Sequence, residues 1–367
     1  MGLVSNLKVD EMAGSTFSRP SVQHKNLNPF ATREDYNIAR KALEGVLGPL
    51  TATQLRIFDN LRVESEFNSS LKNLQPGEIK TAMDYAKEYA DKRISFDGMC
   101  TGLPTLDKKF LLGIKPGDIV TIGGQTGVGK SPFAVNLCLQ MNAQGKNCLL
   151  LGLEDSPYEV GTRIAFIKKG FEKKKDKIKL EGGGTTWVFT DQDANILYQQ
   201  KFALMPILKA YAKVAGAQVV VIDMLNDIID PLGDSDADAF MVQLKTVVDE
   251  LGISLIMIAR LREAKDQNEM VLPNEDSIYG KGMIKYLSTK IITISTDPIN
   301  PFVPKSGFSG VNIQPLWIHV VKNRQGYKTS KQKVAVAVNF ITSDEYMYFE
   351  ERGENPLVNI PETVRRK

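Results

Sequence analysis

The chain has 367 residues, 43% of them hydrophobic and 24% charged, with a net charge of +3. That length suits one large domain with an appendage, or two domains, and so small a net charge neither favours nor excludes a nucleic acid partner. The three cysteines, Cys100, Cys138 and Cys148, have no C-x-x-C spacing, which excludes a zinc ribbon and a disulfide framework and fits a reducing compartment such as the cytoplasm. No window is apolar enough to span a membrane.

The N-terminal hundred residues divide into three predicted parts. Residues 1–30 are rich in Ser, Asn and Lys without periodicity, which predicts a flexible tail. Residues 31–75 carry short helical patterns and predict a small helical appendage. Residues 76–100 predict a linker with an amphipathic helix at 79–92, whose apolar face is formed by Ile79, Met83, Ala86 and Ala90.

From residue 101 to about 355, apolar strands alternate with helices. The predicted strands are 118–123, 147–153, 186–190, 218–224, 253–259, 289–295, 315–322 and 332–340, and the predicted helices are 130–144, 157–170, 195–215 and 237–251. Such alternation indicates an α/β domain with a mostly parallel sheet covered by helices on both faces. The last two strands have no helix between them, which predicts an antiparallel hairpin or meander. Residues 356–367 form a C-terminal tail.

The first of these strands leads into G-G-Q-T-G-V-G-K-S, which from Gly124 fits the P-loop consensus G-x-x-x-x-G-K-[ST]. Backbone N–H groups of such a loop surround phosphate oxygens. Lys130 is expected to reach the β- and γ-phosphates of ATP, and Ser131 to bind Mg²⁺. A glycine-rich turn without nucleotide is the alternative. The predicted nucleotide site consists of Gly124, Gln125, Thr126, Gly127, Val128, Gly129, Lys130, Ser131 and Pro132.

Carboxylates follow two further predicted strands. Strand 147–153 ends at Glu154 and Asp155, and a carboxylate at the end of a strand beside the P-loop can activate the attacking water. We assign that role to Glu154 and expect Asp155 or Ser156 to cap the next helix. The run of β-branched residues at 219–222 ends at Asp223, a pattern that orients Mg²⁺ through water.

Cations occupy two other strand ends. Arg260 follows strand 253–259, where it can sense the γ-phosphate or be a solvated strand-end arginine. Lys322 and Arg324, two positions apart at the end of strand 315–322, point the same way and can stabilise transition-state charge on a phosphoryl group. A charged hairpin tip is the alternative for this pair.

The order of the motifs is more specific than any one of them. The motifs are, in chain order, Thr101–Asp107, Lys115–Asp118, the P-loop, Leu153–Asp155 with Arg163, Val221–Asp223 and Lys322–Gly326. Taken together they resemble the RecA-fold motor domain of DnaB-like replicative hexameric helicases, over about residues 100–350.

The resemblance implies an ATP-dependent replicative helicase, a ring-shaped homo-hexamer that moves along single-stranded DNA, with a primase or helicase loader as further partners. It makes Glu154 the catalytic carboxylate and Asp223 the carboxylate that orients the metal. It makes Lys322 and Arg324 trans-acting groups that reach a neighbour's γ-phosphate, and residues 79–92 the linker helix that packs on the adjacent subunit. If the source is viral, the compartment is the host cytoplasm.

The sequence also departs from the family. Glutamine usually stands where Arg260 does, and the N-terminal region is shorter than the usual helical collar, as in compact phage-like helicases. The first DNA-facing loop corresponds to residues 226–238, which contain no Lys or Arg and repel phosphate through Asp227, Asp230, Asp234, Asp236 and Asp238. DNA binding is therefore expected from the second loop, residues 261–286, through Arg262, Lys265, Lys281 and Lys285.

Three readings remain open. A RecA- or RadA-like recombination ATPase would bind single-stranded DNA without unwinding it, and an assembly or loading factor would use nucleotide as a switch. The predicted linker helix and the Lys-x-Arg pair favour the helicase.

A lysine run within residues 168–179 is either a solvated face or an outer nucleic acid contact.

Overall fold

The computed structural model describes residues 33–58, 98–174, 183–193, 197, 203–262, 273–280, 282–297, 310–324, 334–353 and 356–359. The predicted tail at 1–30, the predicted linker helix at 79–92, Lys265 and Lys281 lie outside these residues. In the described part of the chain, no helix is long and apolar enough to cross a membrane.

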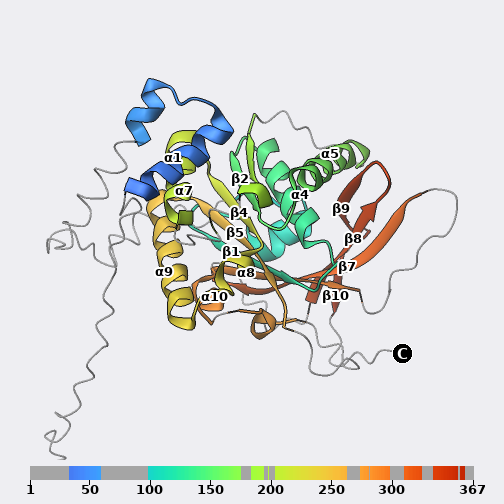
Figure 1. The fold of residues 1–367 in the computed structure, drawn as a ribbon. Coiled ribbons are helices and arrows are strands. Elements are labelled where there is room, and N and C mark those ends of the chain that lie inside the picture. The colour runs from blue at the N-terminus through green and yellow to red at the C-terminus, as the bar shows by residue number, and fades with distance from the viewer. Residues whose placement is uncertain are drawn as a thin grey trace, which may run out of the picture.

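The described strands form one ten-stranded sheet in the order β10-β8-β7-β6-β1-β5-β4-β2-β3, with β9 also paired to β8 (Figure 1). Six strands are parallel: β1 (Ile119–Gly124), β2 (Cys148–Gly152), β3 (Thr186–Phe189), β4 (Val219–Asp223), β5 (Ser254–Arg260) and β6 (Lys290–Thr296). The antiparallel end contains β7 (Asn312–Asn323), β8 (Val334–Thr342), β9 (Met347–Glu351) and β10 (Leu357–Asn359). The predicted mostly parallel sheet with a C-terminal antiparallel hairpin is confirmed.

Helices cover both faces of the sheet (Figure 1). On one face lie α4 (Lys130–Ala143) and α5 (Pro157–Lys173). On the other lie α1 (Arg33–Leu47), α7 (Leu204–Ala210), which continues as a π-helical turn over Tyr211–Ala215, and α9 (Asp234–Leu251). The short helix α8 (Leu225–Ile229) follows β4, and the short helix α10 (Gly282–Leu287) precedes β6.

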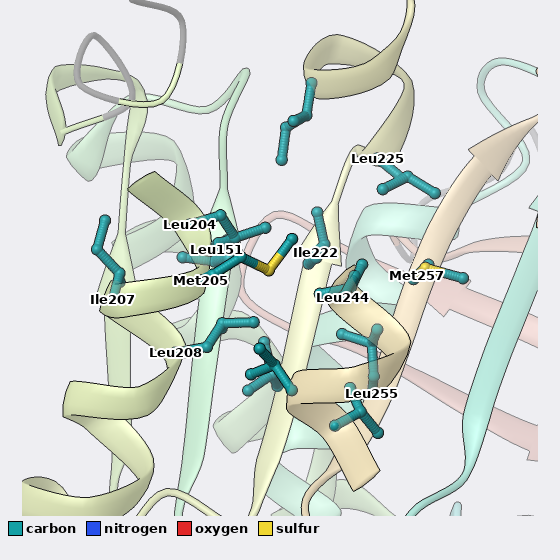
Figure 2. Close-up of a cluster of buried hydrophobic side chains, with 14 of the residues drawn as sticks. Leu151, Leu204, Met205, Ile207, Leu208, Ile222, Leu225, Leu244, Leu255 and Met257 are labelled. Carbon is teal, nitrogen blue, oxygen red and sulfur yellow. The ribbon is translucent and has the colours of Figure 1, made fainter. Parts of the chain in front are cut away.

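The central strands read as continuous apolar runs because both of their faces are buried. In β2, Leu149 and Leu151 pack towards α7 and α9, while Cys148 and Leu150 pack towards α4 and α5. Figure 2 shows the first of these layers, where Leu151 and Ile222 of the sheet meet Leu204 and Leu208 of α7. Every residue of β1, β2 and β4 is buried, which holds the ends of these strands in fixed positions.

The described N-terminal residues pack on the same core. Ala39 and Leu43 of α1, together with Leu50 and Phe58, belong to the apolar cluster that α7 forms with the sheet. The Tyr36 and Phe58 rings lie 5.0 Å apart. Residues 33–58 therefore form an outer layer over α7 of their own chain.

Candidate active site

The P-loop joins β1 to α4 through backbone that only glycine adopts easily. Gly127 and Gly129 have φ angles of 79° and 90°, in the left-handed region. A Cβ atom at Gly124 would lie 2.8 Å from Val128 Cγ1, so a larger residue would push into the loop. The helix then begins at Lys130 with Gly129 as its N-cap. The cradle thus has the backbone freedom and the helix N-terminus that phosphate binding requires.

Lys130 lies inside this loop. It is 9% exposed, and its Nζ donates a hydrogen bond to the Gln125 carbonyl at 2.9 Å. Burial lowers the pKa of Lys130, and the negative charge of Asp223 partly offsets this effect. A phosphate anion would supply the additional negative charge that favours this buried ammonium, so the residues present fit a nucleotide.

Asp223, at the end of β4, is 6% exposed. Burial is the main cause that raises its pKa from 3.8 to about 6, whereas a hydrogen bond with Ser131 lowers it. A magnesium ion would favour the ionised form of this carboxylate, and Ser131 beside it fits the metal-binding role. The described residues contain no group of three or more His, Cys, Asp or Glu that could hold a metal. Mg²⁺ commonly binds through one or two carboxylates together with phosphate oxygens and water, which fits Asp223 and Ser131.

The segment after β2 separates the roles of three consecutive polar residues. Ser156 is the N-cap of α5 and forms a capping box with Glu159. Of the two residues expected as the cap, Asp155 and Ser156, the helix therefore uses Ser156. Asp155 accepts two hydrogen bonds from Arg163, one of them at 3.1 Å. Glu154 takes part in neither arrangement and is 51% exposed.

Glu154 follows β2, which is not paired with the P-loop strand β1. Strands β4 and β5 lie between β2 and β1, so sheet pairing alone does not bring Glu154 to the P-loop. The contact comes from Arg260, which stands beside Gly124 at the end of β5. Its Nη2 lies 2.8 Å from Glu154 Oε1. Arg260 is therefore a strand-end arginine that is ion-paired at the site, with 46% of its side chain exposed.

Asp227 is a site residue that the sequence reasoning missed. Its Oδ1 lies 3.1 Å from the same nitrogen of Arg260. Burial first, and then the charge of Glu154, raises the pKa of Asp227 above its ordinary 3.8, while Arg260 lowers it. Asp227 lies in α8, within the region expected to be the first DNA-facing loop. Two other acidic residues of that region, Asp234 and Asp236, lie in the first turn of α9, where negative charge is favourable.

Lys322 and Arg324 do not approach this site. Because β7 is antiparallel to β6, Lys322 lies opposite Ile291, and the Arg324 N–H bonds to the Thr289 carbonyl at 2.9 Å. Gly124 pairs with Ile294. Arg324 lies about five residues along the strands from the level of the P-loop, which is roughly 16 Å at ~3.3 Å per residue. It is thus near the ends of the strands that point away from the P-loop.

Both of these cations contact α10. Lys322 donates to the Lys285 carbonyl, and Arg324 donates to the Tyr286 carbonyl while lying 5.9 Å from the centre of the Tyr286 ring. Carbonyls at a helix C-terminus attract cations, so α10 orients the pair on one side of β7.

Of the four residues predicted to bind DNA, Arg262 and Lys285 are described. Lys285 pairs with Asp276, and this contact is the main cause that lowers the pKa of Asp276, followed by the charge of Arg262. The structure thus brings Arg262 and Lys285 together around Asp276. The described lysines of the basic run include Lys168, Lys169 and Lys173, which are exposed on α5.

Comparisons with known proteins agree with this architecture. A family model described as "ATPase: KaiC" matches residues 99–333, more than half of the chain. The replicative DNA helicase DnaB of Haemophilus influenzae is 21% identical over 55% of this chain and 47% of its own. The DnaB protein of Buchnera aphidicola subsp. Baizongia pistaciae is 23% identical over 73% of this chain and 63% of its own. The chain spans about half to three fifths of the length of these relatives.

A solved structure of an ATPase domain covers 75% of this chain and all of its own, with a TM-score of 0.51 and 17% identity. At that identity the likeness shows the fold alone, which is the RecA-like ATPase fold. Together these findings confirm the resemblance to the motor domain of DnaB-like helicases. The chain belongs to the family of KaiC-type ATPases.

Proposed function

We propose that this chain is the motor of an ATP-driven replicative DNA helicase, which assembles into a hexameric ring and hydrolyses ATP between subunits while it moves along single-stranded DNA. The observation that carries the proposal is the position of Lys322 and Arg324. Along the strands, Arg324 lies roughly 16 Å and Lys322 roughly 10 Å from the level of their own P-loop, towards the ends of the strands away from it, so they would act on another subunit's nucleotide.

The other half of such a site comes from the P-loop side. Lys130 would bind the β- and γ-phosphates, and the backbone N–H groups from Gly124 to Gly129 would surround them. Ser131 and Asp223 would hold Mg²⁺, which neutralises phosphate charge when bound. Glu154 would accept a proton from the attacking water. Each subunit would then contribute its P-loop to one interface and its Arg324 to the next.

The DNA would be bound through its backbone by the second loop. Arg262 and Lys285 lie close to Asp276 at the described ends of this segment. The first loop offers acidic residues and no cation, so on that part of the chain the cations come from the second loop. A primase or loader would bind elsewhere on the ring.

The alternative functions differ in assembly. A RecA- or RadA-like ATPase would form open filaments on single-stranded DNA, and a nucleotide-switched loading factor would turn over little ATP. Arg260 in place of glutamine and the acidic first loop favour the loading factor, whereas the carboxylates Glu154 and Asp223 argue for hydrolysis.

The test combines negative-stain imaging with forked-DNA unwinding, both in ATP and Mg²⁺. We expect closed six-fold rings and unwinding by the wild-type chain. Glu154→Gln should still bind ATP but lose hydrolysis and unwinding by ~10²-fold or more, because only the base is removed. Open filaments without unwinding would favour the recombination ATPase, and monomers without turnover would favour the loading factor.

A further inference from the structure

One nitrogen atom of Arg260 contacts two carboxylates at once. Nη2 lies 2.8 Å from Glu154 Oε1 and 3.1 Å from Asp227 Oδ1. The side chains of Arg260 and Glu154 are about half exposed, whereas that of Asp227 is 13% exposed. An exposed carboxylate and an enclosed one therefore share a single guanidinium.

Hydrogen bonds through the Asn226 side chain and the Tyr279 backbone hold the end of β5, which carries Arg260, against α8, which carries Asp227. The Arg260 N–H donates to Asn226 Oδ1 at 2.9 Å, and the Asn226 amide donates to the Tyr279 carbonyl at 3.4 Å. The Tyr279 N–H in turn donates to the Arg260 carbonyl at 2.8 Å. Asp227 follows the fully buried Asn226, so α8 and the end of β5 fix its position relative to Arg260. Glu154 belongs to a different segment, after β2, and is the partner that can turn away.

We propose that Asp227 is a positioning residue for hydrolysis, which retains the Arg260 guanidinium at the end of β5 when Glu154 turns towards the attacking water. This inference rests on the proposed function, because it takes Glu154 as the base. A carboxylate held in an ion pair has fewer lone pairs available to orient water. When Glu154 turns away from Arg260, Asp227 remains as the ion-pair partner of the guanidinium.

Removal of Asp227 should therefore affect Glu154 through Arg260. With asparagine at position 227, Glu154 is the remaining carboxylate on Arg260 Nη2 in the described structure, and the ion pair retains the base. With glutamine at position 260, no guanidinium competes for Glu154, and Asp227 has nothing to hold. The effect of Asp227→Asn must then depend on which residue stands at position 260.

The first test uses the protein without nucleotide and measures thermal unfolding of four proteins: wild type, Asp227→Asn, Arg260→Gln and the double variant. In the Arg260→Gln background, Asp227 is an enclosed carboxylate that faces Glu154 without a cation, so Asp227→Asn should raise the melting temperature. In the Arg260 background the same change should leave the melting temperature unchanged or lower it. Equal shifts in both backgrounds would overturn the proposal.

The second test measures ATP hydrolysis and ATP binding by the same four full-length proteins, with Asp344→Asn as the exposed control, which should behave as wild type. Asp227→Asn should lower kcat by about 10- to 100-fold with little change in ATP affinity, because the base is displaced and the phosphates are still bound. In the Arg260→Gln background it should cause no further loss.

The two hypotheses fail in different ways. If Asp227→Asn hydrolyses ATP at the normal rate, or loses the same factor in both backgrounds, the positioning role is wrong while the proposed function stands. If the wild-type chain does not hydrolyse ATP in any assembly, the proposed function is wrong, and the role of Asp227 is refuted with it.

Discussion

The buried carboxylate of Asp223 lowers the free energy of unfolding when it is ionised, and Asp223→Asn would remove this effect. Burial raises the pKa of this carboxylate from 3.8 to about 6. The folded protein therefore binds more protons than the unfolded chain between about pH 4 and pH 6, and its free energy of unfolding falls as pH rises through that window. The shift of ~2 pKa units corresponds to about 3 kcal/mol once Asp223 is fully ionised, at 1.36 kcal/mol per unit.

Asp223→Asn should thus gain stability relative to the wild type as the pH rises. Between pH 4 and about pH 7, its free energy of unfolding minus that of the wild type should increase by up to about 3 kcal/mol. Urea denaturation across pH 4 to 8, without nucleotide or Mg²⁺, measures this difference. Asp344→Asn, which removes an exposed carboxylate, should follow the wild-type curve. Mg²⁺ and ATP should stabilise the wild type more than Asp223→Asn, by mass action. Parallel curves for Asp223→Asn and wild type would refute the argument that burial raises this pKa.

Two further variants test the sheet and the DNA surface. Lys290→Met removes the ammonium partner of Asp118, which is 1% exposed and also accepts hydrogen bonds from Thr289 and Lys115. This variant should cost ~3–5 kcal/mol in urea denaturation, and a loss below about 1 kcal/mol would contradict the importance of this buried pair. Lys285→Ala should reduce the slope of log K against log salt for single-stranded DNA by ~0.7, the value for one lost phosphate contact, and an unchanged slope would move the DNA site elsewhere.

The strands of the parallel sheet could be predicted because burial on both faces leaves a continuous apolar run. The last strands, β9 and β10, were not predicted: they are short, and in β9 only Phe349 is buried, so the strand shows no alternating pattern. Helices α8 and α10 were also missed, since five or six residues do not complete two helical turns and show no periodicity.

The nucleotide-binding residues were predictable because the P-loop is local in sequence. The contact between Glu154 and Arg260 was not, because it spans two strands whose order the sequence does not specify. Asp227 was interpreted as part of an acidic DNA-facing loop. Its position beside Arg260 depends on the hydrogen bond from Arg260 to Asn226, which joins segments 34 residues apart.

The central claim is that hydrolysis needs residues from two subunits, and mixing two inactive variants tests it most directly. Arg324→Ala should bind ATP and form rings yet lose ~10³-fold or more in hydrolysis, as in other P-loop enzymes that lack a trans-acting arginine. Lys130→Ala should be inactive because it does not hold the phosphates.

In random rings from an equal mixture, roughly a quarter of the interfaces should combine an intact P-loop with an intact Arg324, so part of the ATPase activity should return. Recovery that rises with the proportion of mixed rings is the predicted result. Normal hydrolysis by Arg324→Ala alone, or no recovery in rings shown to contain both variants, would contradict catalysis between subunits.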